Sequence, residues 1–318
     1  MRYRQLGRSG LTVSVVGLGC NNFGRRVDLA GTRAVVDAAL EVGVTLFDTA
    51  DIYGTDRDGG SERLLGEALA GRRDDVVIAT KFGSDMAGSN GPDWGVRGSR
   101  RYIRRAVEAS LRRLQTDYID LYQMHEPDPR TPIAETLAAL DELVAEGKVR
   151  YLGSSNFAGW QVAEAEWTAR TVGTERFIGA QNNYNLLERE AEAELVPACE
   201  GYGVGLLPFF PLANGLLTGK YRRGEPAPAG TRLTGKPELL AERNFDRVEA
   251  LEKYADEQGI SLLSVAVGGL AAQPAVASVI AGATRPEQVR ANVTAGEWAP
   301  DAADLAGLDQ VVPSARLA

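Results

Sequence analysis

The chain of 318 residues contains a single histidine, only two cysteines and no apolar run of membrane-spanning length. One histidine and no clustered carboxylates leave too few ligands for a metal-dependent enzyme. Cys20 and Cys199 have no metal-ligand spacing and cannot form a disulfide framework. The N-terminal stretch lacks the apolar core of a signal peptide. These absences predict a cytoplasmic protein without a metal site, and they exclude a membrane segment.

Positive charge is also in short supply. The 35 basic residues are outnumbered by 43 acidic residues, which gives a formal net charge of -8. Because phosphate-backbone binding requires clustered positive charge, a nucleic acid is not expected as a partner. The length allows one large α/β barrel, and no stretch has the composition of a linker. We therefore predict a single domain over residues 1–318; the oligomeric state is left open.

Short apolar runs recur along the chain. Near-continuous hydrophobicity over five to eight residues is typical of strands that are buried on both faces of a parallel sheet. Eight such runs are found: VVGLG (15–19), VTLFD (44–48), VVIATK (76–81), YIDLYQMH (118–125), VRYLGSS (149–155), FIGAQ (177–181), GVGLLPF (203–209) and ASVIAG (277–282).

Amphipathic segments of helical period separate these runs. In residues 131–147, Thr131 is expected as the N-cap and Pro132 as the first helical residue. Eight strand–helix units in series predict an α/β fold, a (β/α)8 TIM barrel. Ahead of them, residues 3–14 indicate a β-hairpin that turns at Gly7–Gly10 and closes the bottom of the barrel.

A doubly wound nucleotide-binding sheet is the alternative fold. Its support is the stretch VVGLGCNNFG, in which Gly17 and Gly19 follow a strand. The dinucleotide fingerprint needs a third glycine at position 22, where this chain has Asn22. Eight consecutive units also exceed what that fold requires, so we reject it.

Four polar side chains fall at or just after the ends of the second, third and fourth predicted strands: Asp48, Tyr53, Lys81 and His125. Barrel enzymes carry their chemistry at this rim. A tyrosine hydroxyl has a pKa of about 10, and a nearby ammonium is expected to lower it, with a carboxylate holding the ammonium. A neutral imidazole can orient a substrate oxygen by hydrogen bonding. The set is suited to proton transfer to a carbonyl oxygen, which needs a hydride from elsewhere.

The stretches FDTADIYG, VIATKFG, LYQMHEPDP, YLGSSNF and LLPFFPLANGLLTGKY, in this order, resemble the aldo-keto reductases. The resemblance extends from about Tyr3 to Asn292 and includes the branch of potassium-channel β subunits. It implies that the four rim residues are the family's catalytic tetrad, with Tyr53 as the proton donor and His125 orienting the carbonyl. The implied cofactor is a nicotinamide dinucleotide, usually NADPH.

The resemblance also implies a set of cofactor contacts. The nicotinamide carboxamide would be held by Ser155, Asn156 and Gln181, and its ring would stack on Phe209. The loop from Pro211 to Lys220 would clasp the pyrophosphate. Others match the adenosine end, and Arg232 matches a phosphate-contacting arginine. The implied contacts are Gly19, Cys20, Asp48, Ser155, Asn156, Gln181, Phe209, Pro211, Leu212, Gly215, Lys220, Arg232, Gly282, Thr284, Gln288 and Asn292.

The chain departs from the family pattern in three places. Relatives commonly have serine where Phe210 stands, and some have Lys or Arg in place of Gly282 and Gln288. The last two departures weaken the case for strict NADPH use, with NADH as the weaker alternative.

In the long loop 83–99, Trp94 is the first candidate for a substrate-facing aromatic, beside Tyr53 and His125.

The expected function is NADPH-dependent reduction of aldehydes, ketones or sugar carbonyls, with a small-molecule carbonyl compound as the substrate. Two alternatives stay open. One is a sugar or alcohol dehydrogenase that uses NAD or NADP on the same fold. The other is a regulatory subunit that binds NADPH and turns over slowly.

Overall fold

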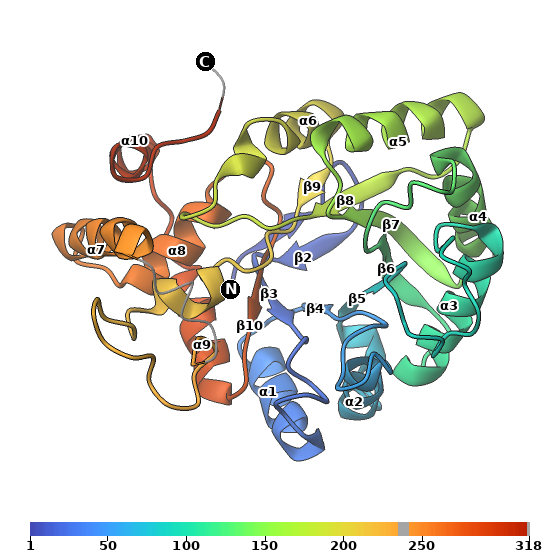
Figure 1. Cartoon of the computed structure of the whole chain (residues 1–318), viewed down its shortest axis with the longest axis horizontal. Coiled ribbons are helices and arrows are strands. Elements are labelled where there is room, and N and C mark those ends of the chain that lie inside the picture. The colour runs from blue at the N-terminus through green and yellow to red at the C-terminus, as the bar shows by residue number, and fades with distance from the viewer. Residues whose placement is uncertain (235–241, 317–318) are drawn as a thin grey trace.

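The computed structural model describes residues 1–234 and 242–316 (Figure 1). Its main sheet has eight parallel strands in the order β10-β3-β4-β5-β6-β7-β8-β9. The Leu206 amide donates to the carbonyl of Ala275, and the Ala277 amide donates to the carbonyl of Leu206, which joins the two ends of the sheet. The predicted barrel is therefore confirmed. The strands are β3 (Val16–Gly19), β4 (Leu46–Asp48), β5 (Val77–Phe82), β6 (Ile119–Met124), β7 (Val149–Ser155), β8 (Phe177–Gln181), β9 (Gly205–Leu206) and β10 (Val279–Gly282).

Helices alternate with the strands and cover the outside of the barrel (Figure 1). Their apolar stripes face the strands: in α3, Ile103, Val107 and Leu114 are all buried. The described helices are α1 (Leu29–Glu41), α2 (Gly60–Ala68), α3 (Arg100–Leu114), α4 (Ile133–Ala145), α5 (Gly159–Val172), α6 (Leu195–Tyr202), α7 (Glu242–Glu257), α8 (Leu262–Ala271), α9 (Pro286–Ala295) and α10 (Ala302–Val311). None of them is both long and apolar enough to cross a membrane.

The predicted N-terminal hairpin is present as β1 (Tyr3–Gln5) and β2 (Thr12–Ser14), which pair antiparallel. Leu6 and Val13 are fully buried in an apolar cluster with side chains from the barrel strands. An Arg4 guanidinium nitrogen also donates to the carbonyl of Val276 at 2.8 Å. The hairpin therefore closes the end of the barrel opposite to the carboxyl ends of the strands.

Two local predictions are corrected. Pro132, not Thr131, is the N-cap of α4, because the Thr131 hydroxyl donates to Asp128 at 2.7 Å instead of capping the helix. The predicted strand 203–209 is shorter, since only β9 (Gly205–Leu206) has strand geometry.

Candidate active site

Lys81 lies at the carboxyl end of β5, and its side chain is fully buried. Its ammonium donates to both carboxylate oxygens of Asp48, each at 2.8 Å, and to the carbonyl of Thr49 at 2.8 Å. Burial opposes the charge on Lys81, but Asp48 and Tyr53 outweigh it, and the pKa of Lys81 is raised. Complete hydrogen bonding lets this ion pair exist out of contact with water.

Asp48, at the end of β4, has further donors. Gln181, at the end of β8, donates to Asp48 Oδ1 at 2.7 Å, and Gln123 in β6 lies at 3.4 Å from the same oxygen. The sequence analysis did not select Gln123. The available signal was a polar residue inside the apolar run YIDLYQMH, where a buried amide needs a partner.

Tyr53 lies in the loop between β4 and α2, with its hydroxyl 3.5 Å from Lys81 Nζ. The expectation of a lowered pKa for Tyr53 is corrected. Burial raises the pKa of Tyr53 above its usual value of 10.0, and the opposing effect of Lys81 is smaller. The phenol therefore keeps its proton at neutral pH in the absence of a ligand.

His125 directly follows β6, and its amide donates to the carbonyl of Phe82 at 2.7 Å. Its ring meets that of Tyr53 edge-on, with centroids 5.9 Å apart. Nδ1 is buried and has no hydrogen-bond partner among the described residues. Burial, together with repulsion from Lys81, lowers the pKa of His125 to about 3, so the ring is neutral.

Asn156 follows β7 with a left-handed backbone, at a φ of 60°. Asparagine tolerates this conformation better than most residues. Its amide nitrogen donates to the carbonyl of His125 at 3.0 Å and to Ser155 Oγ at 3.1 Å. The ends of β6 and β7 are joined by these contacts.

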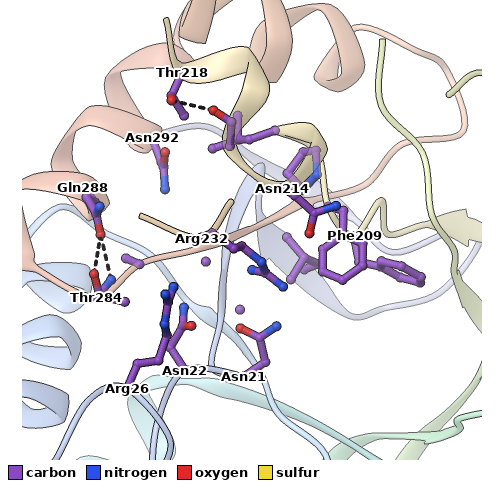
Figure 2. A pocket seen from close by; sticks show the side chains of 18 of the residues that line it. Asn21, Asn22, Arg26, Phe209, Asn214, Thr218, Arg232, Thr284, Gln288 and Asn292 are labelled. Carbon is purple, nitrogen blue, oxygen red and sulfur yellow. Dashed lines mark hydrogen bonds between the residues drawn. The ribbon is translucent and has the colours of Figure 1, made fainter. Parts of the chain in front are cut away.

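A cavity of about 820 Å³ opens above these residues and runs along the rim of the barrel. It brings most of the predicted site residues together. Figure 2 shows part of the lining, with Phe209, Arg232 and Thr284 among the labelled side chains. Those that line it are Gly19, Asp48, Tyr53, His125, Ser155, Asn156, Gln181, Phe209, Pro211, Leu212, Gly215, Lys220, Arg232, Gly282, Thr284, Gln288 and Asn292.

Three predicted residues do not line the cavity. Lys81 lies beneath it, against Asp48. Cys20 is fully buried, and its thiol contacts the carbonyl of Leu18 at 3.5 Å, so its side chain does not reach the proposed cofactor contact. Trp94 is 60% exposed and lies outside the lining, with the guanidinium of Arg101 over its ring at 4.4 Å. The structure thus places Trp94 on the surface of its loop instead of toward Tyr53.

The loop after β9 carries the predicted clasp. Its short helix η3 (Ala213–Thr218) contains non-helical residues, among them Asn214 at a φ of 58° and Gly215 at a φ of 102°. This backbone forms a tight turn, in which the Gly215 amide donates to the carbonyl of Leu212 at 2.7 Å. The Thr218 hydroxyl donates to the carbonyl of Gly215 at 2.7 Å, which stabilises the turn (Figure 2).

At the far end of the cavity, Thr284 donates to Gln288 Oε1 through both its amide, at 2.8 Å, and its hydroxyl, at 3.1 Å (Figure 2). Asn292 lies one turn further along α9. These contacts join Thr284 to Gln288, and they use the Gln288 oxygen internally.

Two arginines face the middle of the cavity from different segments (Figure 2). Arg26 comes from the loop after β3, and Arg232 follows η3. Burial lowers the pKa of Arg232, and repulsion from Arg26 and Arg25 lowers it further. Guanidinium groups that repel each other across a cavity create a site for an anion.

The sequence analysis missed several residues of the lining. Arg26 is the clearest case, since its signal was a pair of adjacent arginines shortly after the first barrel strand. The other missed residues come from the loop after β3, the segment around η3, and α8 to α9. They include Asn21, Asn22, Ala229, Gly230, Thr231, Leu263, Ile280, Ala283 and Ala291.

The chain was compared with known proteins. The family model described as "Aldo/keto reductase family" matches residues 15–313. An uncharacterized oxidoreductase, YrpG, of Bacillus subtilis is 40% identical over 98% of this chain and 96% of its own length. A probable voltage-gated potassium channel subunit beta of rice (Oryza sativa) is 37% identical over 94% of this chain and 92% of its own. The L-glyceraldehyde 3-phosphate reductase of Escherichia coli K12 is 35% identical over 100% of this chain and 94% of its own.

Proposed function

Because the chain belongs to the aldo/keto reductase family, we propose that it is an NADP(H)-dependent oxidoreductase that reduces aldehydes, ketones or sugar carbonyls to alcohols. The observation that carries this proposal is the geometry at one end of the cavity. There a protonated Tyr53 and a neutral His125 lie beside the buried Lys81–Asp48 pair. Relatives named as reductases or oxidoreductases support the same reaction class.

When bound, a reduced nicotinamide would supply the hydride, and the protein would supply the proton and stabilise the phenolate that remains. Tyr53 donates its phenolic proton to the carbonyl oxygen as negative charge develops there. The Lys81 ammonium, 3.5 Å from the phenol oxygen, stabilises the phenolate that forms, and Asp48 holds the ammonium in place. His125 is neutral, so it can donate one N–H to the same carbonyl oxygen without protonating it.

The carboxamide of the nicotinamide would bind among Ser155, Asn156 and Gln181. The Gln181 amide nitrogen already donates to Asp48 at 2.7 Å, which directs its oxygen to accept a hydrogen bond from a ligand. The ring of Phe209 lines the same part of the cavity and offers a stacking surface. This arrangement would connect cofactor binding directly to the Asp48–Lys81 pair.

The phosphates would lie between η3 and the two arginines. Lys220, Arg232 and Arg26 line this part of the cavity and supply positive charge. The 2′-phosphate of NADPH would bind toward Arg232, Thr284 and Gln288, a site that NADH leaves unused. We therefore propose a preference for NADPH, with NADH as a weaker cofactor.

The proposal is tested by following NADPH absorbance with an excess of an activated aromatic aldehyde, with NADH in parallel. Sustained turnover that favours NADPH is the expected result. The panel should include aldoses and a phosphorylated hydroxyaldehyde, because one relative is named for a triose phosphate. Binding of NADPH without turnover of any carbonyl compound would contradict the enzyme assignment.

Relatives named as potassium channel β subunits support a second candidate, a subunit that binds NADPH and turns over slowly. A single turnover followed by stalled, bound cofactor would favour this reading. A dehydrogenase would instead reduce NAD+ or NADP+ with sugars or alcohols faster than it reduces carbonyls. Measuring both directions with both cofactors separates the three functions.

A further inference from the structure

A hydrogen-bonded network of buried polar side chains lies behind the catalytic end of the cavity. Thr80 donates to Glu62 Oε1 at 2.6 Å, and Arg113 donates to Glu62 Oε2 at 2.6 Å. Arg113 also donates to Asn90 Oδ1 at 3.0 Å, and Asn90 donates to Asp51 Oδ2 at 2.9 Å. This network therefore connects residues of β5, α2, α3, the loop after β5 and the loop after β4.

Both ends of this network are next to the proposed catalytic groups. Thr80 directly precedes Lys81 in β5, and Asp51 is two residues before Tyr53. The Asp51 amide donates to the Lys81 carbonyl at 3.1 Å, which gives a second connection between the two segments. The position of the Tyr53 hydroxyl relative to Lys81 is therefore constrained from two sides.

The charges in this cluster do not balance if every group is ionised. Asp51 and Glu62 are fully buried, and among the residues that the structure describes Arg113 is the one arginine that donates to this network. A buried carboxylate without its own cation is unstable, so one carboxyl must hold its proton. Burial and the nearby Glu62 raise the pKa of Asp51 well above its usual value, against the weaker effects of Arg113 and Asn90. Asp51 is accordingly the neutral member of the cluster.

The remaining neighbours of Asp51 have no charge at neutral pH. Tyr102 from α3 and Tyr122 from β6 have buried hydroxyls, and the pKa of each is raised by burial and by Asp51. Asp51 Oδ1 and both of these hydroxyls have no hydrogen-bond partner within residues 1–234 and 242–316. A protonated Asp51 adds a further donor to this group, whereas an ionised Asp51 could only accept hydrogen bonds there.

We infer that Asp51 is a positioning residue: through Asn90 and Arg113 it holds the loop that carries Tyr53 at a set distance from Lys81. The inference rests on the proposed function for its catalytic consequence, but its structural content does not. A misplacement of about 1 Å at a reacting group can lower a rate by roughly 100-fold. The contact between Tyr53 and Lys81 is already as long as 3.5 Å, so any further displacement removes it.

The test compares Asp51→Ala with Asp51→Asn, and uses Asp56→Asn, an exposed position in the same loop, as the matched control. The first readout is the ¹³C NMR signal of the Tyr53 Cζ atom and its titration, assigned with Tyr53→Phe. Loss of the Lys81 contact is expected to raise the pKa of Tyr53 in Asp51→Ala. Because Asn is a neutral isostere, Asp51→Asn and the control should keep the wild-type signal.

The second readout is steady-state reduction. Asp51→Ala should lower kcat by about 100-fold with an unchanged Kd for NADPH, and Asp51→Asn should stay within about 3-fold of the wild type. In Asp51→Ala, the alkaline limit of the pH–rate profile should move upward together with the pKa of Tyr53. If Asp51→Ala does not fold, Asn90→Ala interrupts the same hydrogen-bond network on the other side of the Asn90–Asp51 contact. It is expected to raise the pKa of Tyr53 and to lower kcat in the same way.

An unchanged Tyr53 signal in both Asp51→Ala and Asn90→Ala would overturn the inference. An equally large loss of kcat in Asp51→Asn and in Asp51→Ala would also overturn it, because the position would then need a carboxyl group and not only a neutral hydrogen-bonding side chain. A changed Tyr53 signal in a protein whose wild type reduces no carbonyl compound would support the positioning role while contradicting the proposed function.

Discussion

The two ends of the cavity are built differently. At the catalytic end, Asp48 and Lys81 come from strand ends, and their side chains are only 4% and 1% exposed. At the other end, near η3, we propose that the phosphates bind, and we call it the phosphate end. There Lys220, Arg26 and Gly282 are exposed, and the backbone around η3 has left-handed residues. Strand positions are set by the hydrogen bonds of the barrel, whereas loop positions depend on local turns.

This difference separates chemistry from binding. A buried ion pair with all its hydrogen bonds needs little rearrangement when charge develops on the substrate, which is the basis of electrostatic preorganisation. The phosphate end has exposed cations, which on the proposed function would pair with the anionic groups of the cofactor. Variants at the catalytic end should therefore change rate and stability, and variants at the phosphate end should change affinity.

The largest expected effect is that of Tyr53→Phe, which removes the proton donor and keeps the ring. Turnover should fall by roughly 10²- to 10⁴-fold, because a positioned acid contributes about that much. NADPH binding, measured by fluorescence titration, should be nearly unchanged. Tyr3→Phe at the closed bottom of the barrel is the control, and retained turnover in Tyr53→Phe would remove Tyr53 as the acid.

Lys81→Met should destabilise the protein as well as inactivate it. Removing the ammonium leaves Asp48 buried without its cation, which costs about 3–5 kcal/mol in the free energy of unfolding. The matched variant Lys220→Met, at the exposed phosphate end, should change that free energy by no more than about 0.5 kcal/mol. Denaturant unfolding of both variants makes the comparison, and equal losses would contradict the difference between the two ends.

The neutral His125 predicts a pH dependence of stability. Its pKa is about 3 in the folded protein and about 6.5 when unfolded, so the unfolded chain binds one more proton between these values. The contribution of His125 therefore lowers the free energy of unfolding as the pH falls from 6.5 toward 3, by at most about 1.4 kcal/mol per unit. His125→Gln should flatten this slope in urea titrations; an unchanged slope would mean that His125 becomes protonated in the folded state.

The smallest expected effect belongs to the phosphate end. Arg232→Ala should weaken NADPH binding by roughly 10-fold to 100-fold, the value of one charged hydrogen bond, and NADH binding much less. Turnover at saturating cofactor should stay near that of the wild type. Arg33→Ala, on the exposed face of α1, is the control. Equal weakening of both cofactors would place Arg232 at the pyrophosphate instead of the 2′-phosphate.

The pattern of apolar runs predicted the barrel because burial on both faces of a parallel strand leaves a mark on every residue of that strand. The same reasoning located Asp48, Lys81 and His125, since polar residues that end buried strands must meet at one rim. In the structure Lys81 binds Asp48 and the ring of His125 meets that of Tyr53, which agrees with that expectation. The hairpin was found for a similar reason, through turn residues between two short runs.

Predictions that depended on side-chain direction were less successful. Cys20 adjoins a strand end but points into the core, and Trp94 points to solvent although its loop follows a catalytic strand. A one-residue step along a strand reverses the direction of a side chain, and a loop has no fixed period at all. Arg26 was missed because its approach to Arg232 joins segments about two hundred residues apart.

Local sequence therefore specified which residue types stand at the strand ends, because hydrophobic periodicity and strand order are properties of the chain itself. The protonation states were decided by tertiary structure. Burial raises the pKa of Tyr53 against the effect of Lys81, and it lowers that of His125 to about 3. Desolvation depends on everything that surrounds a group, and only the closed barrel brings those surroundings together.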